Sequence, residues 1–222
     1  MTEKNTRDDR RTSGDEQRLH VILASSSPRR SQLLSDAGVR FIVRTPSSPV
    51  DERLSPDEAA VPEEAAKGLA QKKAGAVVQD LLAENKAGAY VVIGADTMVV
   101  HDGKIFGKPI SLDDGRRMLS ELSGDVHSVI TAVSVWLVQT DGAEDVSLGY
   151  RTFADESKVY FKDLSDKEIT AYLRSGESFD KAGAYAIQGK GADLVDRHEG
   201  AYDTIVGLPV QRLLDEFPDL IR

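Results

Sequence analysis

The stretch that decides the fold is HVILASSSPRRSQLLSDAG, residues 20–38. Its apolar first five residues, His20 to Ala24, predict a short buried strand. Ser27 and Pro28 then predict the N-cap and the first turn of a helix. A strand that runs directly into a helix leaves free backbone N–H groups and the positive end of a helix dipole at one place. Arginines there, such as Arg29 and Arg30, could grip a phosphate, although they also fit an ordinary solvated helix start.

The first half of the chain continues this alternation. Residues 39–46, VRFIVRTP, alternate apolar and polar side chains and predict a half-buried strand. From Pro62 to about Lys86 an apolar stripe predicts a long helix, with Gly88 as its C-cap. The run YVVIGAD, residues 90–96, is almost entirely apolar and predicts a strand buried on both faces.

The second half adds hairpins and shorter helices. Asp102–Gly103 is a strong hairpin-turn signal, and Asp141–Gly142 lies between two long β-rich runs. Ser111 opens one helix as its N-cap, and Ser165 with Glu168 forms a capping-box pattern before another. The chain closes with a short helix in LPVQRLLDEFP. We therefore predict a single α/β domain with a mixed β-sheet flanked by helices.

Composition limits the class of protein. The 222 residues are 40% hydrophobic and 29% charged, enough for one sizeable core. There is no cysteine, which excludes disulfides, thiolate metal sites and cysteine nucleophiles. No apolar run approaches the roughly 18 residues that span a bilayer, and the polar residues 1–18 lack the apolar stretch of a secretory signal. We expect a disordered tail over 1–18, a folded domain over 19–222, no membrane partner and a cytoplasmic location.

The charge balance limits the partners. A formal net charge of −9 argues against a general nucleic-acid binder, which normally carries a basic surface. A polyanionic substrate would therefore have to be held by a local cluster of basic residues, with the help of a metal ion.

Five polar clusters interrupt the predicted scaffold. They are residues 25–30, Asp51–Glu52, Asp96–Thr97, Gly107–Lys108–Pro109 and the segment SFDKAGAYAIQGKGA, residues 178–192. An acid at the end of a buried strand, as we expect for Asp96, is a common site position in α/β sheets. The alternatives are a turn-forming aspartate at Asp96, a turn lysine at Lys108 and a flexible linker over residues 178–192.

Together these clusters offer basic groups for phosphate and acids for a divalent metal. Glu52 and Asp96 would suit Mg²⁺, which binds through one or two carboxylates plus substrate phosphates. No GxxxxGK[ST] loop occurs, which excludes a Walker-type site, and no HExxH or paired-histidine spacing occurs, which disfavours a zinc enzyme. His127 begins a long β run, and we interpret it as structural rather than catalytic.

Seven motifs occur in one order along the chain: ILASSSPRRSQLLSDAG, LAQKKA, GADTMV, GKP, LSGDVHSVITAV, FDKAGAYAIQGKGA and IVGLPV. In this order the chain resembles the Maf (septum-formation) family from about Ile22 to Pro209. The resemblance implies a Maf/ITPase-like α/β domain around a deep cleft, usually found as a homodimer. It also implies a nucleoside triphosphate pyrophosphatase, which uses a divalent cation (Mg²⁺ or Mn²⁺) to release a nucleoside monophosphate and pyrophosphate.

The resemblance also implies roles for individual residues. By matching position, Asp96 is the proton acceptor, and Arg29, Thr97 and Gln188 are associated with substrate choice. The other polar positions that line the family's cleft correspond to Ser25, Arg30, Glu52, Lys73 and Lys108. SPRR, ADT and AIQG resemble the dTTP/UTP subgroup, whereas the 7-methyl-GTP subgroup has SPWR, SDQ and a serine–glutamate pair. One departure is the acidic segment 191–209, where a more apolar strand is expected; it leaves the shape of the cleft near Tyr202 open.

The hypothesis that follows is an in-line attack of water on the α-phosphorus. Asp96 and Glu52 would hold the metal ion, while Arg30, Lys73 and Lys108 would neutralise the triphosphate. A free aspartic acid, with a pKa of about 3.9, is a weak base near neutral pH. Asp96 would therefore act either as a base strengthened by burial or mainly by binding metal and orienting the water.

Other functions remain open at this stage. The same site could serve modified or non-pyrimidine nucleotides, or a nucleotide-binding regulator of cell division in which hydrolysis is incidental. The set of acids and bases favours an enzyme, because binding alone does not need Asp96.

Overall fold

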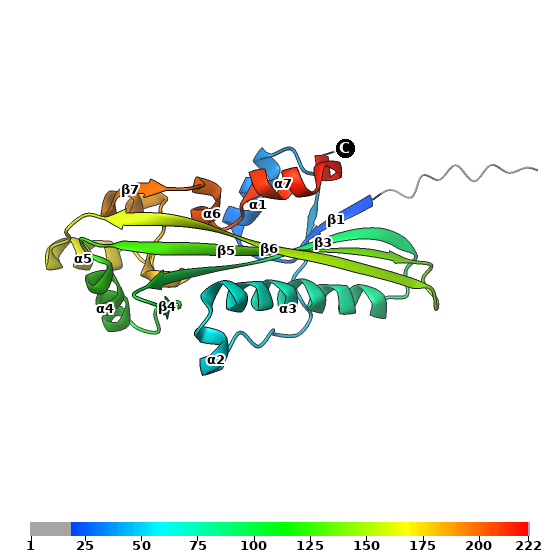
Figure 1. Ribbon diagram of the computed structural model, residues 1–222, viewed down its shortest axis with the longest axis horizontal. Coiled ribbons are helices and arrows are strands. Elements are labelled where there is room, and N and C mark those ends of the chain that lie inside the picture. Colours follow the sequence, from blue (N-terminus) through cyan, green and yellow to red (C-terminus); the bar gives the residue numbers. More distant parts are fainter. Residues whose placement is uncertain (1–18, 222) are drawn as a thin grey trace, which may run out of the picture.

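A seven-stranded mixed β-sheet forms the centre of the molecule (Figure 1). The computed structural model describes residues 19–221, so the tail predicted over residues 1–18 lies outside the described residues. The strand order is β2-β1-β3-β5-β6-β7, with β4 paired to β3. The pairs of β1 with β2 and β3 are parallel and the other pairs are antiparallel, which confirms the predicted mixed α/β sheet. The strands are β1 (Leu19–Leu23), β2 (Ile42–Val43), β3 (Gly88–His101), β4 (Lys104–Phe106), β5 (Val126–Thr140), β6 (Val146–Phe161) and β7 (Val195–Glu199).

Helices cover both faces of the sheet. In Figure 1, α3 lies along one face, α1, α6 and α7 lie on the other, and α4 and α5 gather at one end. The α-helices are α1 (Pro28–Asp36), α2 (Pro56–Ala59), α3 (Pro62–Ala83), α4 (Leu112–Leu122), α5 (Asp166–Leu173), α6 (Tyr202–Val206) and α7 (Val210–Glu216). Three short 3₁₀ helices complete the set: η1 (Ala182–Ala184), η2 (Gly189–Leu194) and η3 (Pro218–Ile221).

The two faces of the central strands are both buried, as the apolar runs predict. Because side chains alternate along a strand, successive residues enter different parts of the core. Val91 packs with Leu34 of α1 and Leu213 of α7, whereas Val92 packs with Ala74 and Val77 of α3. The sheet is therefore held between two helical layers.

The prediction that a strand ends at Asp96 is wrong. β3 pairs with β5 in unbroken register from Gly88↔Thr140 to Val100↔Ser128, so Asp96 lies within the strand. The strand that ends here is β1, which pairs with the other edge of β3. Its last pair with β3 is Leu23↔Ile93, after which the chain turns away toward α1. In the described part of the chain, no strand pairs with this edge of β3 again until β4, at Val99. Asp96 therefore lies at an open edge, beside the carboxyl end of β1.

Other boundaries also differ from the sequence-based prediction. Only Ile42–Val43 of the segment 39–46 forms a strand, and both residues are exposed. α3 ends at Ala83 and Gly88 begins β3, so Gly88 is not a C-cap; Asn85, with φ of 51°, lies in the connecting turn. In the acidic segment 191–209 the structure has the short edge strand β7 and then α6, in place of a more apolar strand.

Three other local predictions, one hairpin turn and two helix N-termini, are confirmed. Asp102 and Gly103 both have positive φ, 48° and 71°, as a tight hairpin turn requires. The Ser165–Glu168 capping box forms at the start of α5, and the Ser111 side chain caps α4.

Gly94 lets α3 approach β3 closely. A Cβ atom on Gly94 would lie 2.7 Å from the Ala70 carbonyl oxygen and 2.8 Å from the Ala74 Cβ atom. These atoms belong to the buried face of α3, so they cannot move without shifting the helix. The absence of a side chain at Gly94 thus sets the distance between α3 and the sheet.

We predict that Gly94→Ala lowers the free energy of unfolding by about 1–3 kcal/mol, because an added methyl group overpacks this contact. Urea denaturation followed by circular dichroism measures the change. The control is Gly68→Ala on α3, where an added Cβ meets nothing within 4 Å. It should leave stability unchanged or raise it by up to about 1 kcal/mol through helix propensity. Equal effects of the two substitutions would contradict the close-approach argument.

Candidate active site

A cleft of about 590 Å³ opens at the free edge of β3. Its walls come from the start of α1, the loop before α2, α3, the middle of β3, the end of β4 and the segment around η1. Five basic and three acidic side chains line it, although the whole chain carries a net charge of −9. They are Arg29, Arg30, Lys73, Lys108, Lys181, Glu52, Asp96 and Asp180. The cleft is thus a local concentration of positive charge, the arrangement expected for an anionic ligand.

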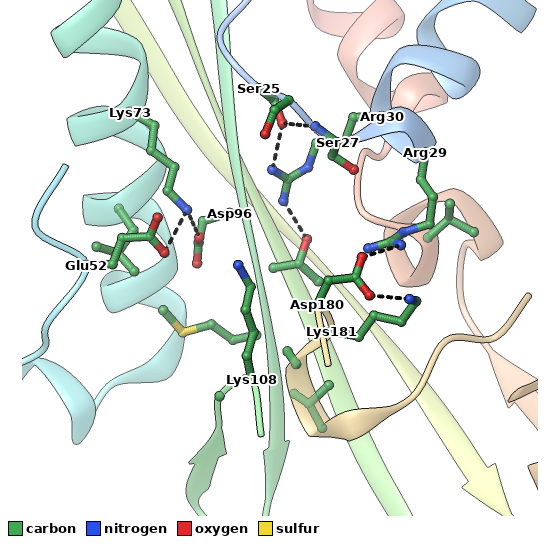
Figure 2. A pocket seen from close by; sticks show the side chains of 18 of the residues that line it. Ser25, Ser27, Arg29, Arg30, Glu52, Lys73, Asp96, Lys108, Asp180 and Lys181 are labelled. Atoms are coloured by element: carbon green, nitrogen blue, oxygen red, sulfur yellow. Dashed lines mark hydrogen bonds and ion pairs between the residues drawn. The ribbon is translucent and has the colours of Figure 1, made fainter. Parts of the chain in front are cut away.

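On the α3 side of the cleft, one lysine joins two carboxylates (Figure 2). The Lys73 Nζ atom lies 2.6 Å from Asp96 Oδ1 and 3.2 Å from Glu52 Oε2. Asp96 is buried, with 7% of its surface exposed, while Glu52 reaches the same point from an exposed loop. The two acids predicted as metal ligands therefore converge on one position, which the ammonium group occupies.

On the opposite side, Arg30 is held by neutral groups. Its Nε donates to the Gly207 carbonyl at 2.8 Å, Nη1 to Ser25 Oγ at 3.3 Å, and Nη2 to Thr97 Oγ1 at 3.1 Å. A guanidinium has five N–H groups, so these bonds leave one N–H on each terminal nitrogen. Two such groups form the fork that binds phosphate oxygens in pairs. Burial lowers the pKa of Arg30, an effect that the nearby Asp96 carboxylate opposes.

Asp96 and Thr97 supply both sides of the site from adjacent positions. Because side chains alternate along β3, Asp96 faces α3 and meets Lys73, whereas Thr97 faces α1 and meets Arg30. A single extended strand at an open edge can therefore present an acid and a hydroxyl to the same cleft.

The start of α1 forms a third wall. Ser27 is its N-cap residue but makes no side-chain capping bond, and no acidic side chain lies in the first turn. The Ser27 N–H instead donates to Ser25 Oγ at 3.2 Å. Uncapped N–H groups and the helix dipole favour an anion here, as the sequence predicts.

Arg29 connects α1 to the segment around η1. Its Nη1 atom lies 3.5 Å from Asp180 Oδ2, and Lys181 binds the other oxygen of the same carboxylate (Figure 2). Partial burial opposes ionisation of Asp180, but the hydrogen bond and charge of Lys181, together with the charge of Arg29, outweigh it and lower the pKa of Asp180. The ion pair thus links two walls of the cleft across its mouth.

The structure brings all nine predicted site residues to this one cleft. Lys108 and Gln188 are the exposed members at its rim besides Glu52, and Figure 2 shows Lys108 reaching toward Asp96. Asp180 and Lys181 stand in the segment 178–192 that the sequence singles out, but neither was assigned a role. Thr131 and Thr204 lie behind Thr97, and neither stands out in the five polar clusters of the sequence. For Thr131 the available signal was a polar residue inside the apolar run VITAV.

His127 is structural, as predicted. It is 2% exposed, does not line the cleft, and its Nε2 atom lies 2.7 Å from the Tyr185 hydroxyl oxygen. Burial lowers the pKa of His127 to about 4, so the ring is neutral near pH 7. Residues 19–221 contain no group of three or more His, Asp or Glu side chains placed to hold a metal ion by themselves.

The fold and the cleft define an α/β protein with a cleft rich in basic residues at the open edge of its sheet. The model of the Maf-like protein family matches residues 20–220, and the chain belongs to this family. It is 45% identical to a dTTP/UTP pyrophosphatase of Geotalea uraniireducens over 88% of this chain and 92% of that protein. It is 42% identical to a dTTP/UTP pyrophosphatase of Hahella chejuensis over 92% of this chain and 95% of that protein.

A weaker similarity relates the chain to a solved nucleoside-triphosphatase / dITP/XTP pyrophosphatase from Mycobacterium abscessus. The two are 12% identical with a TM-score of 0.38, over 90% of this chain and 93% of that one. Among the described helices, none has the length and apolar character that crossing a bilayer requires.

We predict that Arg30→Lys weakens the binding of inorganic tripolyphosphate at least about tenfold. A lysine ammonium can replace neither the three bonds that hold Arg30 nor its phosphate-binding fork. Isothermal titration calorimetry measures the dissociation constant. The control is Arg40→Lys, an exposed arginine outside the cleft, which should bind as the wild type does. Wild-type affinity in Arg30→Lys would rule out the anion-binding role of Arg30.

Proposed function

We propose that this protein hydrolyses dTTP and UTP between the α- and β-phosphates, releasing the nucleoside monophosphate and pyrophosphate. The observation that carries the proposal is the cleft itself: basic side chains outnumber acidic ones around the buried Asp96, in an otherwise acidic protein. The relatives named dTTP/UTP pyrophosphatase support the choice of substrates.

We propose Asp96 and Glu52 as ligands of a divalent cation, Mg²⁺ or Mn²⁺. Their carboxylates already share one cation, the Lys73 ammonium, so the position accepts positive charge. Two carboxylates plus phosphate oxygens are a donor set that Mg²⁺ commonly uses. When bound, the ion would neutralise charge on the phosphates and on the leaving pyrophosphate.

The residues of the chain would then do the following work. Arg30 and the start of α1 would bind phosphate oxygens from one side, and Lys73 and Lys108 from the other. The oxygen of a water molecule attacks the α-phosphorus, and the bond from this phosphorus to the α–β bridging oxygen breaks. Asp96 would orient this water and accept its proton, while the bridging oxygen leaves with pyrophosphate.

The base would be recognised at the rim of the cleft, where Gln188 is exposed. An amide side chain offers one donor and one acceptor, which match the O4 and N3–H edge shared by uracil and thymine. Cytosine presents the opposite pattern, so a Gln188 amide held in this one orientation would reject it.

The decisive test is a product assay. We would incubate the wild type with Mg²⁺ or Mn²⁺ and each common nucleoside triphosphate, plus 7-methyl-GTP, and separate the products. We expect monophosphate and pyrophosphate from dTTP and UTP. Diphosphate with orthophosphate would show that another bond is cleaved. Nucleotide binding without turnover would favour a regulatory nucleotide binder.

In the same assay, we predict that Asp96→Asn lowers kcat at least about 1,000-fold, because the amide neither accepts the proton nor binds a cation well. The matched control is Asp102→Asn in the exposed hairpin turn, where asparagine tolerates the positive φ. It should retain wild-type activity. Near-full activity in Asp96→Asn would refute the role of Asp96.

A second variant tests base recognition. We predict that Gln188→Glu lowers kcat/KM for dTTP and UTP about tenfold or more, because a carboxylate cannot donate a hydrogen bond to O4. Binding of tripolyphosphate, which has no base, should change less than about threefold. The control Gln79→Glu adds the same charge on the exposed face of α3 and should change neither quantity. If dTTP turnover survives in Gln188→Glu, the base is recognised elsewhere.

Several expectations from the sequence stay predictions: the homodimer, the cytoplasmic location and the lack of nucleic-acid and membrane partners. Light scattering of the purified protein would test the dimer directly.

A further inference from the structure

Besides Ser25, two neutral groups from different parts of the fold orient the Arg30 guanidinium. The Gly207 carbonyl, just after α6, accepts from Nε at 2.8 Å, and Thr97 Oγ1, on β3, accepts from Nη2 at 3.1 Å. A Cβ atom added to Gly207, which has a φ of 124°, would lie 3.3 Å from Thr97 Oγ1 and 3.6 Å from Arg30 Nε. The backbone after α6 therefore comes close to both side chains because it carries no side chain of its own.

Both acceptors are tied to Thr131, a buried residue of β5. Thr131 Oγ1 lies 3.0 Å from Thr97 Oγ1 and 2.7 Å from the Thr204 carbonyl oxygen on α6. Gly207 is the C-cap residue of α6, three positions after Thr204. Thr131 and Thr204 are both 0% exposed, so water does not compete for these bonds. A single side chain thus joins β3 to α6 directly behind Arg30.

The chemistry of the groups gives these bonds one direction. The Thr204 carbonyl can only accept, so Thr131 donates its single hydroxyl hydrogen to it. Thr131 then has only lone pairs left for Thr97, so Thr97 is the donor in that bond. The lone pairs of Thr97 face Arg30, whose N–H groups can only donate. Thr131 therefore fixes the Thr97 hydroxyl as an acceptor for Arg30.

Side-chain bonds also attach α6 to the neighbouring strand β6. The Thr204 hydroxyl donates to Asp155 Oδ2 at 2.5 Å, and the Ser157 hydroxyl donates to the Ala201 carbonyl at 2.9 Å. Within the segment, the Gly207 N–H donates to the carbonyl of residue 203 at 2.9 Å. The backbone that offers a carbonyl to Arg30 is thus anchored to two strands of the sheet.

We propose that Thr131 is a positioning residue for phosphate binding, because it fixes two of the three oxygen atoms that orient Arg30. This inference rests on the phosphate-binding role of Arg30 in the proposed function. Thr131 does not line the cleft, so it acts through its neighbours and not on the ligand. Without its hydroxyl, Thr97 is free to turn its hydrogen and α6 loses its bond to β5. The Arg30 side chain then loses its fixed direction.

The test measures the dissociation constant of inorganic tripolyphosphate by isothermal titration calorimetry. We expect Thr131→Val to weaken binding about fivefold, since the bonds that orient a charged group are disturbed. Thr131→Ser keeps the hydroxyl and should bind within about twofold of the wild type. Thr140→Val is the matched control, a buried threonine at the other end of β5 whose Oγ1 accepts from the Gly142 N–H. It should bind as the wild type does.

Two further measurements separate this role from general damage to the core. The Arg30 Nε–H gives an NMR signal that can be assigned by its loss in Arg30→Lys. Its bond to the Gly207 carbonyl slows exchange with water, and Thr131→Val, but not Thr140→Val, should speed this exchange at least about threefold. In a double-mutant cycle, adding Thr131→Val to Arg30→Lys should change the dissociation constant less than about twofold.

Thermal unfolding of every variant is followed by circular dichroism. Should Thr131→Val unfold at the assay temperature, Thr131→Cys replaces it with the same expectation, because a thiol is a weak donor and acceptor. Three results would overturn the inference: wild-type affinity in Thr131→Val, an equal loss in Thr131→Ser, or effects that multiply in the double mutant.

The inference and the proposed function fail in distinguishable ways. A wild type that hydrolyses dTTP and UTP while Thr131→Val binds tripolyphosphate normally overturns this inference alone. A wild type that binds tripolyphosphate with the expected dependence on Thr131, but hydrolyses neither nucleotide, overturns the proposed function alone. A wild type that does not bind tripolyphosphate overturns the inference, whatever it hydrolyses.

Discussion

The unbroken pairing of β3 with β5 is the constraint on which the site depends. This ladder holds Asp96 and Thr97 in extended backbone, although the parallel neighbour β1 ends after Leu23. An edge without a partner would normally be a liability, because its backbone groups stay unpaired. Here β5 pairs with the other edge of β3, and α3 packs closely against the face of β3 at Gly94. The open edge becomes the floor of a cleft rather than a frayed end.

The positive charges in the cleft are of two kinds. Lys73 is paired with two carboxylates, so its charge is largely compensated, and it draws Glu52 and Asp96 together. Arg30 is held by Ser25, Thr97 and the Gly207 carbonyl, all of them neutral. Neutral partners orient a guanidinium without cancelling its charge. The charge of Arg30 therefore stays uncompensated by its bonding partners, whereas Lys73 holds the two acids close together.

Many features of the chain could be predicted from short stretches of sequence, since they depend on neighbouring residues. Ser27 with Pro28 marks the start of α1, Ser165 with Glu168 forms the capping box of α5, and Asp102–Gly103 makes the hairpin turn. In each case the backbone preference or side-chain bond involves residues at most three positions apart in the sequence. Eight of the nine predicted site residues lie in the polar clusters that stand out in the sequence, and Lys73 follows only from the motif resemblance. The structure places all nine around one cleft.

Local patterns failed where a distant partner decided the outcome. The pair Asp96–Thr97 looks like a strand end, because polar residues usually stop a buried run, yet β5 carries the strand past it. Only the tertiary structure brings Lys73 to Asp96, 23 residues away, and Thr131 to Thr97, 34 residues away. The residue types that an anion site needs can thus be identified in the sequence. Their convergence, and the direction of the hydrogen bonds behind them, follow from strand register and helix packing, which no short stretch encodes.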